Sequence, residues 1–309
     1  MYLFHNERQA SSILRNYHQK LEAIARDRQQ QDRMISDRDY PTEVLILRPQ
    51  QTQGLPLVLL GGMGPIAGLE GFKQAIALCG NSREIILFQA CFLPDRTIPI
   101  QQNSNSLKCE LIMLLKIAIE RAVKMVSSPH QPIDIIVLCN SAHYFLHRVW
   151  KQLKEHSPTI AQQLQHYSLV ESTCQYLQEQ NLRYPLILGT EGVRLGKVYS
   201  QPLESRGIAY SEPNQLLQNA LMDCIYCGVK ALNRELACEL GKQLLPKLLS
   251  NQGNIDCIIA GCTEIVYLLQ WIKEDGDREM IKMINSLNVI DPVNLALQRT
   301  IKENQPKKL

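Results

Sequence analysis

The pattern of apolar and polar residues divides most of the chain into short strands and longer helices. From residue 57 onward, brief runs that are almost wholly apolar alternate with stretches in which apolar residues recur every three or four positions. The apolar runs predict buried strands at residues 57–60, 84–89, 133–138, 185–188 and 255–260. The periodic stretches predict helices at residues 69–78, 107–126 and 144–153. This alternation indicates an α/β fold in which helices cover both faces of a parallel sheet.

The first 54 residues follow a different pattern. An amphipathic helix, packed on the body of the protein or on a partner subunit, is predicted by the helical spacing of Ile13, Tyr17, Leu21 and Ile24. Residues 43–48 predict a short strand, and residues 49–56 predict a connecting loop because a proline stands at each end. We therefore treat residues 1–54 as an N-terminal extension that is mainly helical.

The two halves of the remaining chain share a plan. The first predicted strand of each half runs into a glycine-rich turn, Gly61-Gly-Met-Gly-Pro65 or Gly189-Thr-Glu-Gly192. A later strand of each half begins with Ile-Asp and ends at a cysteine, which is Cys139 in the first half and Cys262 in the second. A duplicated α/β unit explains this plan better than a chance similarity of two α/β halves. We expect one domain over residues 55–155 and a second over residues 156–287.

The composition of the chain limits which binding partners and which cellular compartment we expect. The 309 residues carry a formal net charge of only +3, whereas nucleic-acid or membrane binding calls for a concentrated basic surface. The sequence lacks the long apolar run of a transmembrane helix, and its charged N-terminus lacks the apolar core of a signal peptide. Ten cysteines in such a chain indicate reduced thiols in the cytoplasm. We therefore expect a cytoplasmic protein with neither a nucleic-acid nor a membrane partner.

Cys139 and Cys262 are the strongest candidates for chemistry, although most cysteines are small core residues. In an open α/β sheet, the carboxyl ends of the strands display the catalytic groups. A thiol titrates near ~8.5, so a modest shift of its pKa lets it exchange protons near neutrality. If one thiolate removes a proton from a carbon and a second thiol returns one to the opposite face, that carbon is inverted. The alternative, a nucleophilic pair of Cys139 with His143, leaves Cys262 without a role.

Small hydrogen-bonding residues follow both cysteines. Asn140, Ser141 and Thr263 can bind the carboxylate or the amine of a substrate, and they can equally cap helices. Backbone N–H groups in the glycine turns and at helix N-termini can hold the substrate carboxylate while an α-proton leaves. His143 can either tune Cys139 or serve as a capping and packing residue.

We expect no metal and no cofactor. The seven histidines do not cluster along the chain. Cys224-x-x-Cys227 lies in a predicted helix without a second pair of ligands, so these cysteines are interpreted as core or helix-face residues. The first glycine turn lacks the spacing of a dinucleotide-binding loop.

Together these motifs resemble the aspartate/glutamate racemase family, and its aspartate racemase branch in particular. The similarity covers about residues 55–295 and rests on Gly61-Gly-Met-Gly-Pro65, Pro94-Asp-Arg-Thr97, Cys139-Asn-Ser-Ala-His143, Gly189-Thr190 and Gly261-Cys-Thr-Glu-Ile265. The resemblance implies two pseudo-symmetric parallel-sheet α/β domains, with the active site in the cleft between them, and racemisation without a cofactor. It also implies that a last strand and helix, within residues 288–309, return to the first domain.

The same resemblance assigns roles to individual residues. Cys139 and Cys262 would be the two bases, and Arg96 and Lys230 would pair with the distal carboxylate of a small acidic amino acid. The alternatives are a surface ion pair for Arg96 and a solvated helix face for Lys230. The remaining substrate-binding residues would be Met63, Gly64, Asn140, Ser141, Thr190 and Thr263. The residues that support the cysteines would be His143 and Glu264.

Four positions bear on the branch and on the pocket. Glu264 stands where glutamate racemases usually carry His, which favours the aspartate branch. Three residues depart from the family pattern: Val193 replaces a frequent Thr, Leu232 replaces a usual Gly, and Lys197 lies near a position that is often Gly. These departures could change the pocket shape or the substrate, while both cysteines are present.

The leading hypothesis is a homodimeric racemase that interconverts L- and D-aspartate, or glutamate, by proton transfer between Cys139 and Cys262. A second hypothesis keeps the fold but changes the reaction to isomerisation or decarboxylation of a related dicarboxylate. A third is a non-catalytic protein in which the cleft binds an amino acid and residues 1–54 recruit a partner.

Overall fold

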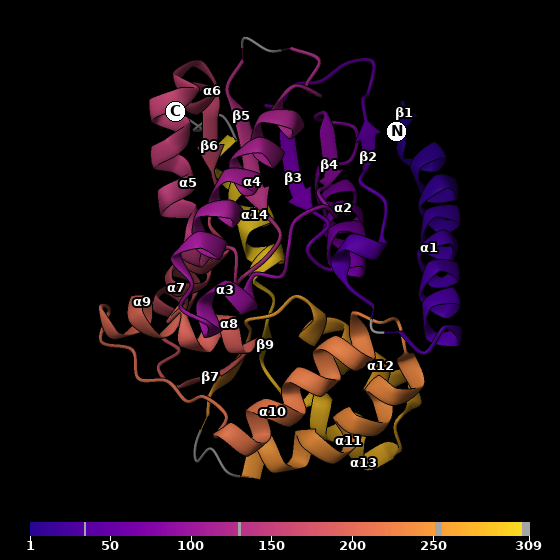
Figure 1. Cartoon of the computed structure of the whole chain (residues 1–309), viewed down its shortest axis with the longest axis vertical. Helices are drawn as coiled ribbons and strands as arrows, with labels where there is room; N and C mark the ends of the chain where they lie inside the picture. The colour runs from indigo at the N-terminus through magenta and orange to yellow at the C-terminus, as the bar shows by residue number, and fades with distance from the viewer. Residues whose placement is uncertain (34, 129–130, 251–254, 305–309) are drawn as a thin grey trace.

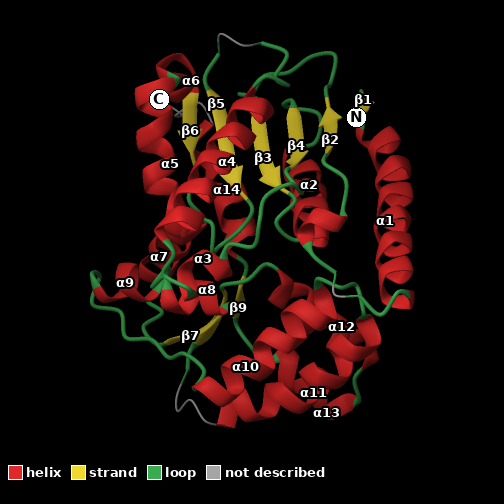
Figure 2. Ribbon diagram, in the orientation of Figure 1, coloured by secondary structure: helices red, strands yellow, loops and turns green. Residues whose placement is uncertain are grey.

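The computed structural model of the chain contains two β-sheets, each flanked by helices (Figures 1 and 2). It describes residues 1–33, 35–128, 131–250 and 255–304. Within these residues, the larger sheet has six strands in the order β1-β2-β4-β3-β5-β6, and the smaller has three in the order β7-β8-β9. The expected α/β fold is confirmed.

Three strands form the buried centre of the larger sheet. β3 (Leu57–Gly61), β4 (Ile85–Gln89) and β5 (Ile133–Val137) are buried along their whole length, which explains the continuous apolar runs that predicted them. β3 lies between the other two and pairs in parallel with both. β6 (Leu164–His166) adds a further parallel strand beside β5. This centre orients the first glycine turn and the Cys139 strand toward the same end of the sheet.

Helices cover both faces of this sheet. α4 (Asn105–Val123) and α5 (His143–His156) pack on one face, and α2 (Pro65–Cys79) and α14 (Pro292–Asn304) pack on the other. α2 starts before its predicted first residue because Pro65 is well suited to the first turn of a helix. The larger sheet is also accompanied by α3 (Thr97–Gln101) and α6 (Pro158–Gln163), whereas α7 (Leu169–Glu179) shares its core mainly with the smaller sheet. Among the described residues, none of the helices is long and apolar enough to cross a membrane.

The smaller sheet repeats part of the larger one. β7 (Pro185–Leu188), β8 (Cys257–Ala260) and β9 (Val289–Ile290) run parallel. In each half, the strand that enters the glycine turn lies next to the strand that leads to the cysteine, β3 beside β5 and β7 beside β8. The helices of this half are α8 (Glu191–Leu195), α9 (Ser200–Glu204), α10 (Gln215–Asp223), the π-helical turn η2 (Cys224–Val229), α11 (Arg234–Ser250), α12 (Glu264–Asp275) and α13 (Arg278–Asn285).

The N-terminal extension joins the larger sheet. α1 (Glu7–Gln30) is the predicted amphipathic helix, and its apolar face shares a core with α2 on the body of the protein. β1 (Tyr2–Phe4) and β2 (Glu43–Leu47) add two strands, and β2 runs antiparallel to β4. The sequence does not predict this antiparallel pairing, because the apolar residues of β2 do not indicate which strand it pairs with or in which direction. α1 also reaches the second half (Figure 1), where the Gln29 side chain donates to the carbonyl oxygen of Ala231 at 3.0 Å.

The last strand differs from the expectation. β9 pairs with β8 in the smaller sheet and does not return to the larger one. β7 occupies only one side of β8, so the other side is available to β9 before the chain crosses between the halves. α14 alone makes the crossing and packs against α2 and α7. Residues 305–309 of the predicted returning segment lie outside the described residues.

Candidate active site

The two candidate cysteines lie at the carboxyl ends of β5 and β8. Cys139 and Cys262 are each 7% exposed. Arg96 lies within electrostatic range of Cys139, and Lys230 lies within range of Cys262. Because Arg96 and Lys230 also act on each other, the structure brings these predicted residues of both halves into one site.

Two glycines let the halves approach closely at this site. Gly64 precedes α2 and lies against the Glu264 carboxylate of the other half, where a Cβ atom would collide with that carboxylate. A Cβ atom on Gly192 would lie 2.9 Å from the Thr97 hydroxyl oxygen, again across the two halves. The glycine turns are therefore needed for close backbone approach, as well as for local turn geometry.

The Cys262 turn surrounds its thiol with an acidic neighbour. The Cys262 thiol donates a hydrogen bond to Oε2 of Glu264 at 2.9 Å, and the Thr263 hydroxyl donates to the same oxygen at 2.9 Å. Burial, followed by the negative charge of Glu264, raises the pKa of Cys262 well above its usual range, although the Lys230 cation opposes the shift. Cys262 is therefore held as a protonated thiol at neutral pH.

The hydrogen-bonding groups of the Cys139 turn are neutral. The Cys139 sulfur lies 3.4 Å from the Ser141 hydroxyl oxygen. Nε2 of His143 accepts a hydrogen bond from the Leu169 N–H at 3.1 Å, so the ring proton is on Nδ1, which donates to the Cys139 carbonyl oxygen at 2.9 Å. Burial lowers the pKa of His143 to about 4. Both ring nitrogens thus bind backbone groups, which does not favour a nucleophilic Cys139–His143 pair.

Arg96 and Lys230 are both buried, with exposures of 2% and 8%, so the surface alternatives for both are wrong. Arg96 donates to the carbonyl oxygens of Met63 at 2.6 Å and Pro94 at 2.9 Å. Lys230 follows η2 and lies 4.5 Å from the centre of the Tyr226 ring. These contacts orient two cations toward the interface between the halves.

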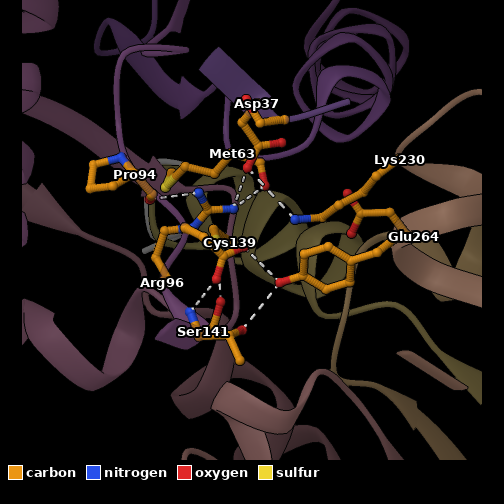
Figure 3. A network of polar contacts seen from close by, with 12 residues as sticks. Asp37, Met63, Pro94, Arg96, Cys139, Ser141, Lys230 and Glu264 are labelled. Carbon is orange, nitrogen blue, oxygen red and sulfur yellow. Dashed lines mark hydrogen bonds and ion pairs between the residues drawn. The ribbon is translucent and has the colours of Figure 1, made fainter. Parts of the chain in front are cut away.

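Asp37 is a site residue that the sequence did not predict. It belongs to the short 3-10 turn η1 (Asp37–Asp39) of the extension, and its Oδ2 lies 2.8 Å from Nη2 of Arg96 and 3.7 Å from Nζ of Lys230. Figure 3 shows this carboxylate between the two cations. Burial, the largest single influence, lowers the pKa of Arg96 and of Lys230, but Asp37 and the other acidic groups around each cation together raise both pKa values. No motif marks Asp37, because it lies in an ordinary polar turn.

Asp95 completes the charge balance. It stands inside the Pro-Asp-Arg-Thr motif, accepts a hydrogen bond of 2.7 Å from the Tyr226 hydroxyl and caps the Thr97 N–H at 2.6 Å. Burial opposes its ionisation, yet the Arg96 and Lys230 cations together lower its pKa. Two carboxylates therefore already face the two cations.

Three buried polar atoms at this site have no partner among the described residues: Nδ2 of Asn140, Nε of Arg96 and Oε1 of Glu264. The rest of Asn140 is engaged, because its Oδ1 accepts a hydrogen bond of 2.5 Å from Tyr199 of the other half. Buried donors and acceptors are rarely left without partners in native proteins. Two donors and one acceptor are therefore free to bind a ligand.

The other predicted residues lie near the site in supporting positions. Thr190 caps α8, with its hydroxyl 3.4 Å from the Val193 N–H. Met63 contributes its carbonyl oxygen to Arg96, and Thr263 contributes its hydroxyl to Glu264. Thr190 therefore caps a helix, whereas Thr263, for which capping was an alternative, makes no side-chain capping bond to α12.

Two of the three departures from the family pattern have a backbone consequence. Lys197 and Leu232 adopt φ values of +50° and +54°, the left-handed region that glycine adopts without strain. Leu232 also packs against the core of the extension and α2, and against the core of the second half. Its side chain thus joins the extension to the second half beside Lys230. Val193 is buried in a core cluster of the second half.

A cavity of about 580 Å³ adjoins Lys230 and Asp37. It is bordered by residues 35–38 of the extension, by residues of the first half around Asp95 and Thr97, and by Tyr226 and Lys230 of the second half. Its volume falls in the range of small-molecule sites. Within the described ranges, no group of three or more His, Cys, Asp or Glu side chains is placed to hold a metal ion.

Comparison with known proteins gives a consistent result. Residues 60–300 match the family described as Asp/Glu/hydantoin racemase. The fold is similar to that of an aspartate racemase from Picrophilus torridus, with a TM-score of 0.60 and 18% identity over 81% of this chain and 94% of that one. It is also similar to an aspartate racemase homologue from Pyrococcus horikoshii, with a TM-score of 0.51 and 18% identity over 81% of this chain and 99% of that one.

Proposed function

We infer that this chain, which belongs to the Asp/Glu/hydantoin racemase family, interconverts L- and D-aspartate, with glutamate as the second candidate. The family consists of racemases that need no cofactor, and membership in it supports racemisation as the reaction. The identity of the substrate and the groups that move the proton are our proposal.

One observation carries the proposal. The unpartnered atoms at the interface are two donors, Asn140 Nδ2 and Arg96 Nε, and one acceptor, Glu264 Oε1. An α-amino acid offers the complementary set, a carboxylate that accepts and an ammonium group that donates. The two thiols beside these atoms supply the acid and the base.

The proposed reaction moves one proton at each face of Cα. In one direction the Cys139 thiolate removes the α-proton and becomes a thiol, while the Cys262 thiol gives its proton to the opposite face and becomes a thiolate. The reverse direction exchanges these roles, and no electron is transferred to or from the substrate. Lys230 offsets the negative charge that then develops on Cys262.

An acidic side chain suits this site because the cations already hold carboxylates. Asp37 and Asp95 show that buried Arg96 and Lys230 can balance negative charge in this position. Charge-assisted hydrogen bonds to a carboxylate are among the stronger polar contacts in proteins.

The proposal is tested by incubating the protein with L-aspartate in D2O. We expect D-aspartate, measured by chiral chromatography, together with deuterium at Cα, measured by NMR, without added pyridoxal phosphate. A product other than the enantiomer would favour the isomerase or decarboxylase hypothesis. Ligand binding without turnover for any acidic amino acid would favour the non-catalytic hypothesis.

We further propose a homodimer in the cytoplasm. All ten cysteines are free, which fits a reducing compartment. Light scattering coupled to size exclusion tests the dimer, and a monomeric mass with full activity would contradict it.

A further inference from the structure

Asp37 lies where a ligand carboxylate would be expected to bind. Its Oδ2 bridges Arg96 and Lys230, one cation from each half, and its side chain is only 8% exposed. Arg96 lies within electrostatic range of Cys139, and Lys230 within range of Cys262. The extension thus supplies an internal carboxylate to the site that the two halves form.

The turn that carries Asp37 does not need the Asp37 carboxylate for its own structure. Asp39 closes the turn by accepting hydrogen bonds from the N–H and hydroxyl of Ser36 at 2.7 and 3.2 Å, and it pairs with Arg33 at 2.9 Å. The Asp37 side chain instead pairs with Arg96 and Lys230. Its carboxylate therefore acts on the site, and Asp39 holds the turn.

Binding a further carboxylate at the two cations costs electrostatic free energy. Asp37 and Asp95 already balance them, so an added negative charge at the same place meets repulsion from both. The cavity of about 580 Å³ is bordered by Asp37 and Arg38 and offers space for a displaced side chain.

We propose that Asp37 is an internal competitor for the distal carboxylate of the substrate, and that an acidic amino acid binds by displacing it from Arg96 and Lys230. The proposal rests on the proposed function and names the residue that sets substrate affinity. The apparent affinity is reduced by the fraction of molecules in which Asp37 occupies the cations.

The test compares Asp37→Asn with Asp32→Asn in the full-length protein. Asp32 is an exposed residue of the same extension, and its backbone N–H bonds to Gln29, so the control removes one charge outside the site. We expect Asp37→Asn to lower KM for aspartate by about tenfold. We expect Asp32→Asn to leave KM unchanged.

A binding measurement separates this inference from the proposed function. Succinate has two carboxylates and no α-amino group, so it probes the site without reaction. Calorimetry should give a Kd for succinate about tenfold lower in Asp37→Asn than in the wild type. If neither protein racemises aspartate but this shift is present, the proposed function fails and the inference stands.

Removal of Asp37 also leaves two buried cations short of a partner, which destabilises the protein. Succinate should therefore raise the melting temperature of Asp37→Asn more than that of the wild type. If Asp37→Asn does not fold, Asp39→Asn loosens the turn while keeping the Asp37 carboxylate, and it should lower the Kd for succinate by a smaller factor. Unchanged or weaker succinate binding in the folded variants would overturn the inference.

Discussion

The Cys139 and Cys262 turns occupy matching places in the two halves, but they surround their thiols with different groups. Cys262 donates to a carboxylate that also receives the Thr263 hydroxyl. Cys139 lies beside the Ser141 hydroxyl, and the nearby His143 is a neutral ring bound to backbone groups. The same scaffold position therefore carries a thiol that donates to a carboxylate in one half and a thiol beside a neutral hydroxyl in the other, with the Arg96 cation within electrostatic range of Cys139.

This difference shows that a repeated fold does not imply equivalent acid and base groups. The sequence suggested two near-equivalent thiols, whereas the pKa of Cys262 is raised by burial and by Glu264. Two enantiomers have equal free energy in water, so kcat/KM must be the same in both directions for a given protein. Any asymmetry between the cysteines must appear in kcat and KM taken separately.

The largest expected effect is the loss of either thiol. Cys139→Ala and Cys262→Ala should each reduce racemisation by about 10³-fold or more, because each removes the proton donor or acceptor at one face. Chiral chromatography measures the loss. Cys109→Ala removes an exposed cysteine and should leave the rate unchanged. Substantial activity in either active-site variant would rule out the two-base mechanism.

Replacing Glu264 should have the next largest effect. Glu264→Gln should lower kcat/KM by about 10- to 100-fold in both directions of racemisation. The change in kcat and the change in KM should differ between the L-to-D and the D-to-L direction. Loss of the carboxylate charge should also lower the pKa of Cys262. The rise in rate with pH that reports deprotonation of Cys262 should therefore move to lower pH. A pH profile identical to that of the wild type would mean that Glu264 does not tune the thiol.

His143 should affect stability more than catalysis. Its pKa is about 4 in the folded protein and near ~6.5 in an unfolded chain. Because the unfolded state binds more protons between these values, the free energy of unfolding should fall by up to about 3 kcal/mol as pH drops from 6.5 to 4. Urea unfolding across this range should give a shallower pH dependence for His143→Gln. An unchanged slope would show that the ring is not held neutral.

The smallest effect is expected at Ser141. Its hydroxyl is a neutral neighbour 3.4 Å from the Cys139 sulfur, and Ser141→Ala should change kcat/KM by less than about tenfold. Steady-state kinetics of Ser141→Ala and Glu264→Gln under the same conditions compare the two turns directly. A larger loss in Ser141→Ala would reverse the contrast between them.

Much of the fold could be predicted because buried parallel strands are continuous apolar runs. The strands near Leu57, Ile133 and Pro185 and the helix through Tyr17 were predicted for this reason. The partners of β2 and β9 could not be predicted in the same way. An apolar run shows that a strand is buried but not which strand it pairs with, because the pairing depends on which strand lies beside it in space.

The candidate site could be predicted where a reactive side chain follows the end of a strand in both halves. Cys139 and Cys262 carry that signal, and Arg96 and Lys230 came from the family resemblance. Asp37 carried no signal, because its role depends on the path of the extension over the interface rather than on its sequence neighbours. Tyr199 was missed for the same reason, since it reaches Asn140 from the other half.

The antiparallel pairing of β2 with β4 has a consequence for any truncated form of the protein. Deleting residues 1–54 would remove β2 from one side of β4 and leave a row of unpaired N–H and C=O groups along an apolar strand. Such an exposed edge is a template for self-association and aggregation. A larger oligomeric size after truncation would then reflect association through the newly exposed strand edge and not the native assembly. The role of the extension is therefore better studied by point substitution.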